Sequence, residues 1–594
     1  MHFAQPLDEP PVMNNAAISE TFELVADLLE FQGANPFRVR AYRNGARTIR
    51  DYPQQMHALL ADPQFKLTDI SGVGKDLADK IATLCSTGTL TMLEELQSQV
   101  PQSVLALLRI PGLGPKKAAV LFNELKVTSL DELRAVCEAQ KVRHLKGFAA
   151  KTEQMILAGI SLANSLGERM LWAEADQYAQ AIRTHLLGSP SVEQIELAGS
   201  YRRGKETIGD LDVLVIASQV GSVMDQFATI PDMGEIVGRG PTKMTIRLAH
   251  GLQVDLRVVP AESFGAALVY FTGSKDHNIV LRSLAKDRGL KINEYGVFRT
   301  RRGGDELVAG RTEEEVYATL DLPWIPPELR EARREFEWAE AGNLPHLIEL
   351  ADLCGDLHMH TTATDGKATL IEMVEAARAR GLRYIAITDH SKRVSMANGL
   401  DAARLRRQWS EIDQLNKSLR GFRVLKGVEV DILEKGGLDL DDDVLGDADW
   451  VVASVHYGQN QPREQITARI LGALENPYVS AIAHPTGRLI NRRKPYDVDL
   501  ESVFKAARDN GKLLELNANP NRLDLDDVAC AAAKSFGIPI VISSDAHSTS
   551  GLEVLRYGVL QARRAGLTKA DVANARPLSK LDALRHSRRA KALR

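Results

Sequence analysis

Histidines and acidic residues stand at the ends of short apolar segments throughout the chain beyond residue 350. Seven histidines lie there, and six of them close such a segment or the turn after it. In a barrel of alternating strands and helices the carboxyl ends of the strands converge on one mouth, which would gather these side chains into a cup. A hydrogen bond at a strand end explains any single histidine but hardly the whole set. The candidate metal ligands are His358, His360, Asp365, His390, Glu429, His456, His484, Asp545 and His547.

Six imidazoles and three carboxylates exceed what one tetrahedral zinc ion needs. We therefore expect two or three Mn²⁺, Zn²⁺ or Fe ions in this cup, and with them hydrolysis of phosphoesters. Arg488 and Lys494, in PTGRLINRRKP, are candidates for holding a substrate phosphate, although a solvated loop explains them equally well.

A second group of acids lies in the first half of the chain. In GDLDVLVIA, Asp210 and Asp212 are two residues apart on an expected strand, so both carboxylates project from one face. Asp255, in LQVDLRVV, adds a third carboxylate if the two strands are neighbours. A lone Asp-x-Asp would indicate a solvated edge strand, whereas three carboxylates suit two Mg²⁺ or Mn²⁺ ions. The upstream GSYRRG segment offers groups suited to a triphosphate, namely Gly199, Ser200 and Arg203.

Three segments share an apolar lead-in, a glycine turn and an amphipathic helix: 67–84, 107–122 and, less clearly, 142–157. They resemble helix-hairpin-helix units, whose glycines let backbone N–H groups approach a DNA phosphate. One such turn also occurs in ordinary helix connections, but two good copies favour binding of the DNA backbone without sequence preference. The candidate DNA-binding residues are Gly72, Gly74, Lys75, Gly112, Gly114, Lys116 and Lys117.

The segment 37–50 is another candidate for phosphate contact. Four arginines follow helical spacing there, and four apolar residues follow it one position earlier. No acid is interleaved, which favours a phosphate-facing ridge over an ordinary solvated helix face. The arginines are Arg40, Arg43, Arg47 and Arg50, and the apolar residues are Val39, Tyr42, Ala46 and Ile49.

Composition bounds the class of protein. A chain of 594 residues suggests roughly four domains, and 44% apolar with 26% charged residues indicates a soluble chain without a membrane span. The net charge of −4 means that nucleic-acid binding depends on local patches. The opening MHFAQPLDEPPV lacks the features of a secretory signal. Cys85, Cys137, Cys354 and Cys530 are too widely spaced for a disulfide framework or a thiolate zinc site, so a cytoplasmic location is expected.

The pattern of elements changes along the chain. Residues 165–262 read as a helix and short alternating strands, typical of an antiparallel-rich α+β unit. Residues 263–330 read as mixed helix and turn, and 331–350 as a charged connecting helix. From residue 351 strands alternate with helices, which predicts a closed barrel. The end, 576–594, carries seven basic residues against one acid and is expected to be flexible.

Four segments together resemble the nucleotidyltransferases, and among them the X-family DNA polymerases related to the vertebrate gap-filling polymerase beta. They are GSYRRG, GDLDVLVIA, YFTGSKDHNIVLR (270–282) and INEYGVF (292–298). The resemblance implies that Asp210, Asp212 and Asp255 are catalytic metal ligands for attack of the primer 3′-oxygen on the α-phosphate. The nucleotide-binding residues that it implies are Gly199, Ser200, Arg203, Gly209, Tyr270, Phe271, Gly273, Asn278 and Arg282.

The same family carries a lyase lysine in its first helix-hairpin-helix, which forms a Schiff base with the sugar left by base loss. That position falls on Lys80 of GVGKDLADKI, and AYR (41–43) matches the family's 5′-phosphate pocket. Asp76 stands where the family has a cation that contacts phosphate, which weakens this assignment in favour of an ordinary surface lysine. Lys275 also departs from the vertebrate enzyme, which has an acid there, so the affinity for nucleotide is expected to differ.

Residues 351–575 resemble the PHP (polymerase and histidinol phosphatase) family, a distorted seven-stranded barrel with a trinuclear metal cluster. All nine ligand positions carry a metal-competent residue, which implies an active hydrolase. Across nearly its full length the chain resembles the bacterial X-family DNA polymerases with a C-terminal PHP domain. That resemblance implies filling of short gaps in DNA repair, especially base excision repair, and a Mn²⁺-dependent 3′–5′ exonuclease. It also implies endonuclease activity at abasic sites and removal of 3′-phosphate blocks.

The implied domain order is a lyase-like helical domain with the first helix-hairpin-helix at 1–95, helix-hairpin-helix fingers at 96–164 and a nucleotidyltransferase palm at 165–262. A thumb at 263–330, a linker at 331–350, the PHP barrel at 351–575 and a basic tail at 576–594 follow. The expected substrates are gapped or nicked DNA and dNTPs, and the chain is expected to be monomeric. Two alternatives stay open: a template-independent nucleotidyltransferase fused to a small-molecule phosphatase, and a non-catalytic DNA scaffold.

Overall fold

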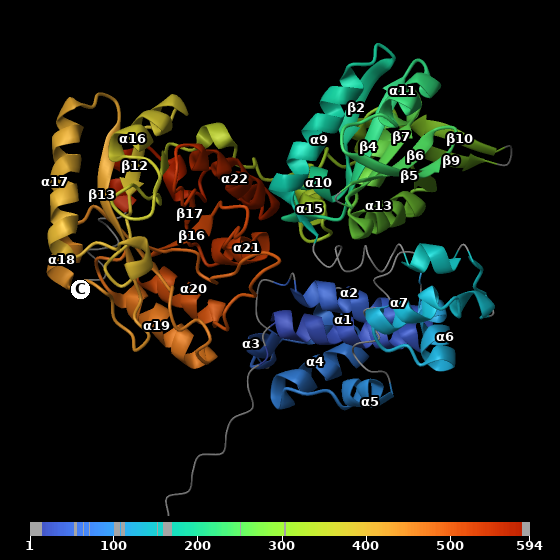
Figure 1. Ribbon diagram of the computed structural model, residues 1–594, viewed down its shortest axis with the longest axis horizontal. Helices are drawn as coiled ribbons and strands as arrows, with labels where there is room; N and C mark the ends of the chain where they lie inside the picture. The colour runs from blue at the N-terminus through green and yellow to red at the C-terminus, as the bar shows by residue number, and fades with distance from the viewer. Residues whose placement is uncertain are drawn as a thin grey trace, which may run out of the picture. The chain divides into compact units, whose positions relative to one another are not determined.

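The structure is a computed structural model whose chain divides into two compact units, Met1–Glu168 and Arg169–Arg594. Figure 1 labels the elements of both units. The described residues are 13, 15–50, 52, 56–62, 65–70, 72–99, 107, 113, 115–145, 147–150, 152–157, 169–249, 251–301 and 304–584.

The described part of the first unit is helical. Its longest helices, α1 (Asn15–Phe31) and α2 (Pro36–Arg50), pack along each other. The apolar stripe expected on 37–50 is confirmed, because Val39, Tyr42 and Ile49 are all buried. The other helices are α3 (Met56–Leu60), α4 (Lys75–Thr87), α5 (Thr91–Gln99), α6 (Pro115–Leu125) and α7 (Leu130–Glu138).

Arg43 corrects the expectation of a free arginine ridge on α2. Its guanidinium lies 3.3 Å from Glu23, 2.7 Å from Asp27 and 2.7 Å from Glu30, all on α1. The acids that neutralise it lie on the neighbouring helix, so the absence of acids within 37–50 did not show the charge of its surroundings. The side chains of Arg47 and Arg50 lie outside the described residues.

The first glycine turn has the geometry expected of a helix-hairpin-helix. Gly72 has a φ of 88° and Gly74 precedes the first residue of α4. Nothing lies within 4 Å of a Cβ built on Gly74, so this backbone is open to an incoming group. Gly147, in the third segment, has a φ of 89°. The glycines of the second turn, Gly112 and Gly114, and the side chain of Lys116 lie outside the described residues.

The second unit opens with a five-stranded sheet in the order β2-β4-β7-β6-β5. Strands β4 and β7 are parallel, and the other pairs are antiparallel, as the alternating pattern predicted. Its apolar residues pack against α9 (Trp172–Leu187) and α11 (Val220–Phe227). The strands are β2 (Val192–Leu197), β4 (Asp210–Ala217), β5 (Met233–Arg239), β6 (Lys243–Leu248) and β7 (Gln253–Val258).

The region 263–330 contains strands as well as the expected helices. After α12 (Phe264–Thr272) and α13 (Lys275–Asp287), the strands β8 (Leu290–Asn293), β9 (Gly296–Arg301) and β10 (Gly304–Ala309) form an antiparallel sheet. Sequence patterning missed this sheet because β9 and β10 expose most of their residues and carry many charges. The helix α14 (Glu313–Ala318) follows.

The expected connecting helix over 331–350 is much shorter than predicted. Only α15 (Glu335–Glu340) forms there, followed by irregular backbone. Glu335 is fully buried and contacts His277 Nδ1 at 2.9 Å, so this segment packs into the fold rather than spanning solvent.

Beyond residue 351 a seven-stranded parallel sheet runs in sequence order from β11 to β17. A parallel bridge between Met359 and Ala546 joins the extensions of the first and last strands, which nearly closes the barrel and confirms that prediction. The strands are β11 (Gly355–Asp356), β12 (Tyr384–Ile387), β13 (Arg423–Asp431), β14 (Trp450–Ser454), β15 (Ala481–Ile482), β16 (Leu513–Asn517) and β17 (Ile540–Ser543). The covering helices are α16 (Leu370–Ala379), α17 (Ala402–Ser418), α18 (Asp442–Asp447), α19 (Arg463–Glu475), α20 (Leu500–Asp509), α21 (Asp527–Ser535) and α22 (Leu555–Arg564).

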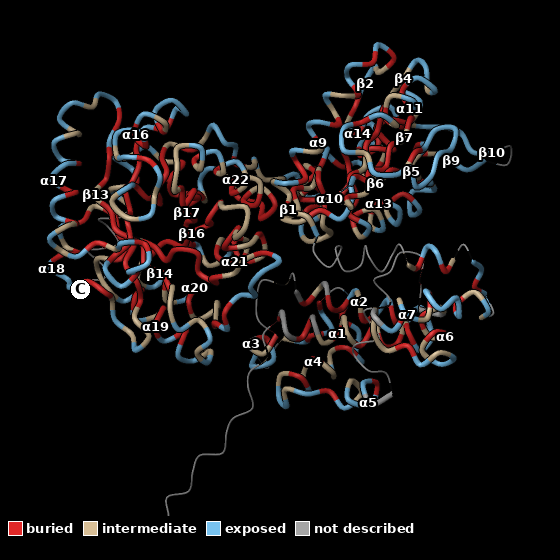
Figure 2. The backbone as a smooth tube through the Cα atoms, in the orientation of Figure 1, coloured by how far each residue is buried: buried red, intermediate tan, exposed pale blue. Residues whose placement is uncertain are grey.

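Alternate residues of the barrel strands point to opposite faces. Tyr384 and Ala386 belong to an inner apolar cluster, whereas Ile385 and Ile387 pack with the outer helices. Figure 2 shows these strands as buried along most of their length. Leu581 joins the inner cluster and is 1% exposed, so the expectation of a flexible end from residue 576 is wrong for 576–584. Residues 585–594 lie outside the described part.

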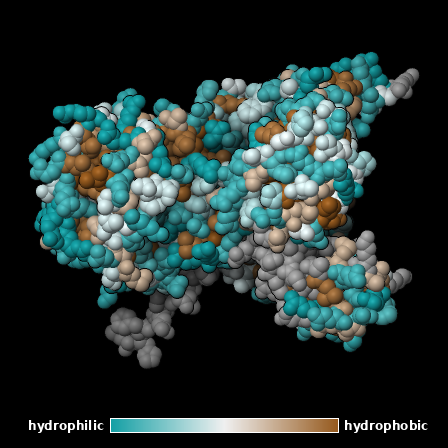
Figure 3. Space-filling model, turned by 45° about the horizontal axis from the view of Figure 1, so that its top comes forward, coloured by the Kyte–Doolittle hydropathy of each residue, from teal (hydrophilic) through white to brown (hydrophobic). Residues whose placement is uncertain are grey.

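Within the described residues, no helix is both long and apolar enough to cross a membrane. The face shown in Figure 3 is covered mainly by hydrophilic residues, with separate hydrophobic patches.

Candidate active sites

The structure makes the two acid-bearing strands of the first site direct neighbours. β4 and β7 pair in parallel with Asp212 opposite Asp255 and Asp210 opposite Gln253. The neighbouring strands that the third carboxylate required are therefore present. Leu211 is fully buried beneath them, as the period of a strand dictates.

The three carboxylates influence one another electrostatically. Burial, followed by repulsion from Asp210 and Asp255, raises the pKa of Asp212 to about 7. Burial and Asp255 also raise the pKa of Asp210. Burial opposes the charge of Asp255, but hydrogen bonds from Thr245 and Gln253 and the ammonium of Lys243 outweigh it and lower its pKa.

The carboxylate of Asp255 makes its contacts with Lys243, Thr245 and Gln253. Lys243 Nζ lies 3.2 Å from Asp255 Oδ1, and Gln253 Nε2 donates to Oδ2 at 2.9 Å. Among the described residues, the three acids do not form a group whose ligand atoms all lie within 4.8 Å of one another. Binding of a divalent cation between them would replace the contact with Lys243.

The backbone at residue 199 approaches the Asp212 carboxylate so closely that only a glycine fits there without a shift. Gly199 begins α10 (Gly199–Arg202) with a φ of 65°, and a Cβ there would lie 2.6 Å from Asp212 Oδ2. The Ser200 hydroxyl is buried and has no hydrogen-bond partner among the described residues. An unpartnered buried hydroxyl beside acids fits a site that binds a phosphate together with a divalent cation.

Arg203 is engaged in the structure. Its Nε lies 3.1 Å from Glu331 Oε1, and its Nη1 donates to the Thr272 carbonyl at the end of α12. This contact brings Arg203 to Gly273, whose Cβ position would be 3.2 Å from Nη1. Arg203 and the α12 end, both implied in nucleotide binding, thus lie side by side.

The other residues implied in nucleotide binding gather around the same helix end. Tyr270 and Phe271 stack edge to face at 5.0 Å, and Asn278 Nδ2 donates to the Tyr270 carbonyl at 2.7 Å. Arg282 Nε donates to the Asn278 carbonyl at 3.1 Å. Gly209 lies directly before β4.

Lys80 on α4 is paired with Asp76, one helical turn earlier. Its Nζ also lies 5.8 Å from the centre of the Tyr42 ring. Burial opposes the charge of this ammonium, but Asp76 and Tyr42 outweigh it and raise the pKa of Lys80. A Schiff-base lysine needs a free amine, so this environment disfavours such chemistry.

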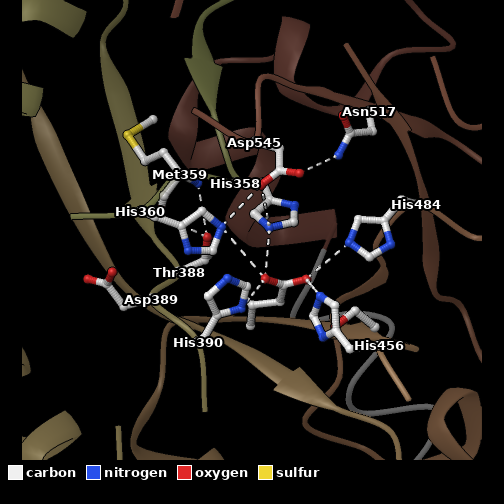
Figure 4. Close-up of polar contacts among 12 residues, drawn as sticks. His358, Met359, His360, Thr388, Asp389, His390, His456, His484, Asn517 and Asp545 are labelled. Carbon is white, nitrogen blue, oxygen red and sulfur yellow. Dashed lines mark hydrogen bonds and ion pairs between the residues drawn. The ribbon is translucent and has the colours of Figure 1, made fainter. Parts of the chain in front are cut away.

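The second site lies at the carboxyl ends of the barrel strands. His358 and His360 follow β11, His390 follows β12, and Glu429 lies within β13. Figure 4 shows imidazoles from different strands turned toward one another. Four further predicted ligands follow β14, β15 and β17, namely His456, His484, Asp545 and His547, and the ninth, Asp365, lies in the loop after β11.

Glu429 is the common centre of these imidazoles. Its Oε2 lies 3.4 Å from His358 Nε2, 3.6 Å from His360 Nε2 and 2.8 Å from His390 Nδ1. Its Oε1 lies 3.4 Å from His456 Nε2 and 3.2 Å from His484 Nε2. Glu429, with imidazoles near each of its oxygens, would help to hold divalent cations at the centre of the cup.

Three overlapping groups in the cup have ligand atoms within 4.8 Å of one another. Asp365 belongs to the outer group and contacts His390 Nε2 at 3.5 Å and His547 Nε2 at 3.4 Å. The groups are His360, Asp365, His390 and His547; His358, His360 and Asp545; and His390, Glu429 and His456. They include eight of the nine predicted ligands, and the ninth, His484, contacts Glu429 Oε1 at 3.2 Å.

The charges in the cup favour bound cations. Burial opposes a positive charge on His358, but Glu515, Asp545 and Glu429 outweigh it and raise its pKa well above the ordinary value. Burial and repulsion from His390 lower the pKa of His360 to about 4. Carboxylates that raise the pKa of one imidazole this strongly would also favour a divalent cation in place of the proton.

The donor set fits divalent metal ions. Neutral imidazoles with carboxylates suit Mn²⁺, Zn²⁺ and Fe. Several buried atoms in the cup make no hydrogen bond of normal geometry within the described residues, although some of them lie in ion-pair contact with one another: His358 Nε2, His360 Nδ1, His390 Nδ1, His484 Nδ1 and Glu429 Oε2. Buried polar atoms normally have partners, so these atoms are suited to metal coordination.

Sequence reasoning missed the residues that orient the ligands. Glu515 Oε1 lies 2.7 Å from His358 Nδ1, Asp431 Oδ1 lies 3.1 Å from His456 Nδ1, and Asn517 Nδ2 donates to Asp545 at 3.0 Å. Such contacts fix the ring orientation of a ligating histidine. The signal was a charged residue inside an apolar strand, as in LLELN (513–517).

Arg488 serves as a structural contact rather than an exposed phosphate ligand. Its Nη2 lies 2.6 Å from Glu206, which precedes β4, and donates to the Leu523 carbonyl at 2.7 Å. Its Nε donates to the Arg522 carbonyl at 2.9 Å. Arg488 therefore fastens the barrel to the segment that leads into the first site.

Five known protein families match successive parts of the chain, and separate families cover the acidic site and the imidazole cup. The chain matches the families Helix-hairpin-helix domain over residues 13–90, SAM-like Helix-hairpin-helix tandem over 104–161 and DNA polymerase beta palm over 169–243. It also matches DNA polymerase beta thumb over 267–331 and PHP domain over 356–519.

Individual relatives cover either the whole chain or one part of it. A DNA polymerase/3′-5′ exonuclease PolX of Bacillus subtilis is 40% identical over 573 residues, 96% of this chain and 99% of that protein. A DNA polymerase lambda of Rattus norvegicus is 27% identical over 55% of this chain and 58% of its own. A probable phosphatase of Acetivibrio thermocellus is 35% identical over 32% of this chain and 78% of its own.

Proposed function

Because the chain belongs to the bacterial PolX family of DNA polymerases with a 3′–5′ exonuclease, we propose that it fills short gaps during base excision repair and processes the 3′ ends of the same DNA. Its substrates are then gapped or nicked DNA and dNTPs, bound by a monomer. The observation that carries the proposal is the presence, in one compact unit, of an acidic site on a polymerase palm and an imidazole cup in a PHP barrel.

In the palm, Asp210, Asp212 and Asp255 would hold divalent cations, which neutralise charge on the reacting phosphates. The open backbone at Gly199 and the unpartnered hydroxyl of Ser200 support binding of the triphosphate there. When a triphosphate binds, the guanidinium of Arg203 would leave Glu331 and contact a phosphate instead. The end of α12 and the start of α13 would enclose the sugar and base, through Tyr270, Phe271, Gly273, Asn278 and Arg282.

In the barrel, nine side chains would hold two or three ions, with Mn²⁺ as the preferred metal. Glu429 lies between the two sets of imidazoles, and Glu515 and Asp431 orient the rings of His358 and His456. Most of the ligands are buried, so only the end of a strand or an extruded sugar–phosphate can reach them. This accessibility supports 3′-terminal trimming, removal of 3′ blocks and cleavage at abasic sites.

In the helical unit, the glycine turns at Gly72 and Gly74, with Lys75, would contact the DNA backbone; the same role is proposed for Gly112, Gly114, Lys116 and Lys117. Lyase chemistry at Lys80 has less support, because Asp76 holds its ammonium. Phosphate contacts by this unit position the DNA without reading its sequence.

End-labelled substrates test the proposed function. The purified chain is incubated with a one-nucleotide gap, an abasic site or a 3′-phosphate terminus, each with Mg²⁺ or Mn²⁺. We expect insertion of the templated nucleotide into the gap, and Mn²⁺-stimulated cleavage or trimming of the other two substrates. Insertion that ignores the template base, or hydrolysis limited to small phosphate esters, would contradict the proposal.

A further inference from the structure

A groove of about 400 Å³ lies between the palm and the barrel. Glu206 and Thr207 form its palm side, and residues 488–495 form its barrel side. The one acid of the lining, Glu206, is bound by Arg488 at 2.6 Å. The rest of the barrel side contributes Arg492, Arg493 and Lys494, so the groove is strongly basic.

One end of this groove adjoins the polymerase acids. Thr207 lies three residues before Asp210, and Arg169 fixes it by donating to its hydroxyl at 3.0 Å and its carbonyl at 2.8 Å. A Cβ on Gly209 would lie 2.9 Å from Arg169 Nη1, so this guanidinium lies beside the turn into β4. Asn491 of the barrel loop donates in turn to the Arg169 carbonyl.

The other end leads to the imidazole cup. The loop 488–495 begins four residues after His484, and Arg493 donates back to the Gly487 carbonyl at 2.7 Å. Arg488 donates to the carbonyl of Arg522, whose own Nε lies 4.0 Å from Asp545 Oδ2 in the cup. Cationic side chains therefore continue from the groove to the metal-binding cup.

The chemistry of the groove indicates its ligand. Its lining contains no aromatic side chain on which a base could stack, whereas its exposed cations suit phosphates. Arg492 is exposed and makes no ion pair with any residue that the structure describes. Six of the nine ligands in the cup at one end are buried, which suits a single strand better than a duplex.

We propose that this groove binds the phosphates of a single-stranded 3′ end of DNA and guides it between the two active sites of one molecule. The proposal rests on the proposed function, because a 3′ end must be a substrate of both sites. Attraction by several side chains of one sign lets the strand slide without a fixed register, as its movement between two sites requires.

The test removes two exposed cations of the groove by Arg492→Ala with Arg493→Ala. The matched control is Lys417→Ala with Arg420→Ala, an equal charge change at the end of α17, before the amino end of β13 and away from the mouth. Fluorescence anisotropy measures binding of a duplex with a labelled single-stranded 3′ tail across a range of salt concentrations. The loss of two phosphate contacts should reduce the log–log salt slope by about 0.7 each and weaken binding by on the order of tenfold at 0.1 M salt.

A second readout follows transfer itself. The enzyme is first bound to a labelled primer with a mismatched 3′ end. Addition of dNTPs with a large excess of unlabelled DNA then starts the reaction and prevents rebinding. The measured quantity is the labelled product that has been both trimmed and extended during this single encounter. We expect the groove variant to lose most of this product while matched gap filling and hydrolysis of bis(p-nitrophenyl) phosphate stay at the wild-type level. A groove variant with the salt slope and the trapped product of the control overturns the proposal. A wild type that binds the tail through the groove but never trims it would instead refute the proposed nuclease function.

Discussion

Gly199 provides the most specific perturbation of the palm site. It begins α10 with a φ of 65°, and a Cβ there would lie 2.6 Å from Oδ2 of Asp212. Gly199→Ala therefore adds one methyl group against a proposed metal ligand without touching the imidazole cup. The left-handed backbone costs an L-residue about 1–2 kcal/mol, which sets the expected loss in free energy of unfolding.

The loss of activity should be larger than this loss of stability. The Asp212 oxygen must retreat from 2.6 Å to the 3.4 Å of an ordinary contact, a shift of close to 1 Å. A misplacement of about 1 Å among reacting groups costs on the order of 100-fold in rate. We therefore expect kcat/KM for filling a one-nucleotide gap to fall by on the order of 100-fold in Gly199→Ala.

The assay compares gap filling and 3′–5′ degradation in one preparation. Degradation should stay within about twofold of wild type, because the cup is untouched. Gly221→Ala, in α11, is the matched control, since nothing lies within 4 Å of its Cβ position. Gap filling by Gly199→Ala at nearly the wild-type rate, with the fold intact, would refute the reasoning that the position of the Asp212 carboxylate limits synthesis.

Three further predictions concern stability, metal affinity and the lyase lysine. Burial opposes the charge of Glu313, but the buried Arg330 and the half-buried Arg202 outweigh it and lower its pKa to about 2. Glu313→Gln should therefore lower the free energy of unfolding by roughly 3 kcal/mol at pH 7. Because the folded pKa is depressed, urea denaturation should show this difference in full above about pH 4.5 and show it vanishing as the pH falls through about 2. Glu515→Gln removes the carboxylate on His358 and should weaken Mn²⁺ binding about 10–100-fold, measured by Mn²⁺ titration of the exonuclease. Borohydride should trap little adduct between Lys80 and a 5′-deoxyribose phosphate at pH 7, and Asp76→Asn should increase it.

Each of these predictions has a contrary result. If the stability difference for Glu313→Gln persists below pH 2, the ion pairs of Glu313 are not its cause. Unchanged Mn²⁺ dependence in Glu515→Gln would mean that this carboxylate does not orient a ligand. Equal trapping in Lys80→Ala would assign any lyase chemistry to another amine.

The barrel and its cup could be predicted from the sequence because the signal is repeated. Most strands from β12 to β17 are short and apolar, and most are followed within a few residues by a histidine or an acid. Closure of a parallel barrel brings these strand ends together, so the cup follows once the barrel is predicted. The third carboxylate was expected only if its strand neighboured that of Asp210 and Asp212, and the register that places Asp212 opposite Asp255 meets this condition.

Contacts between distant segments could not be predicted in this way. The charge of Arg43 depends on acids of α1, and Arg488 is buried against Glu206, 282 residues earlier in the chain. The burial of Leu581 likewise depends on the inner apolar cluster of the barrel, which it joins. Local patterning identifies residue types and faces, whereas the partner of a charge is decided by tertiary packing.

The weak strands and the short connecting helix have a similar explanation. β9 and β10 expose most of their side chains, so hydrophobic periodicity was absent there. The charges of 331–350 suggested a solvated helix, but Glu335 is buried against His277 and Glu331 against Arg203 and Arg564. A charged segment can be internal when its partners are buried with it.

The central claim is that two separate metal sites of one chain build and degrade DNA. The most direct measurement assays synthesis on a gapped duplex and 3′–5′ degradation for Asp212→Ala and His360→Ala, alongside wild type and with folding checked by circular dichroism. We predict that Asp212→Ala loses synthesis and keeps degradation, and that His360→Ala does the reverse. Loss of both activities in either folded variant would contradict the account of two independent sites.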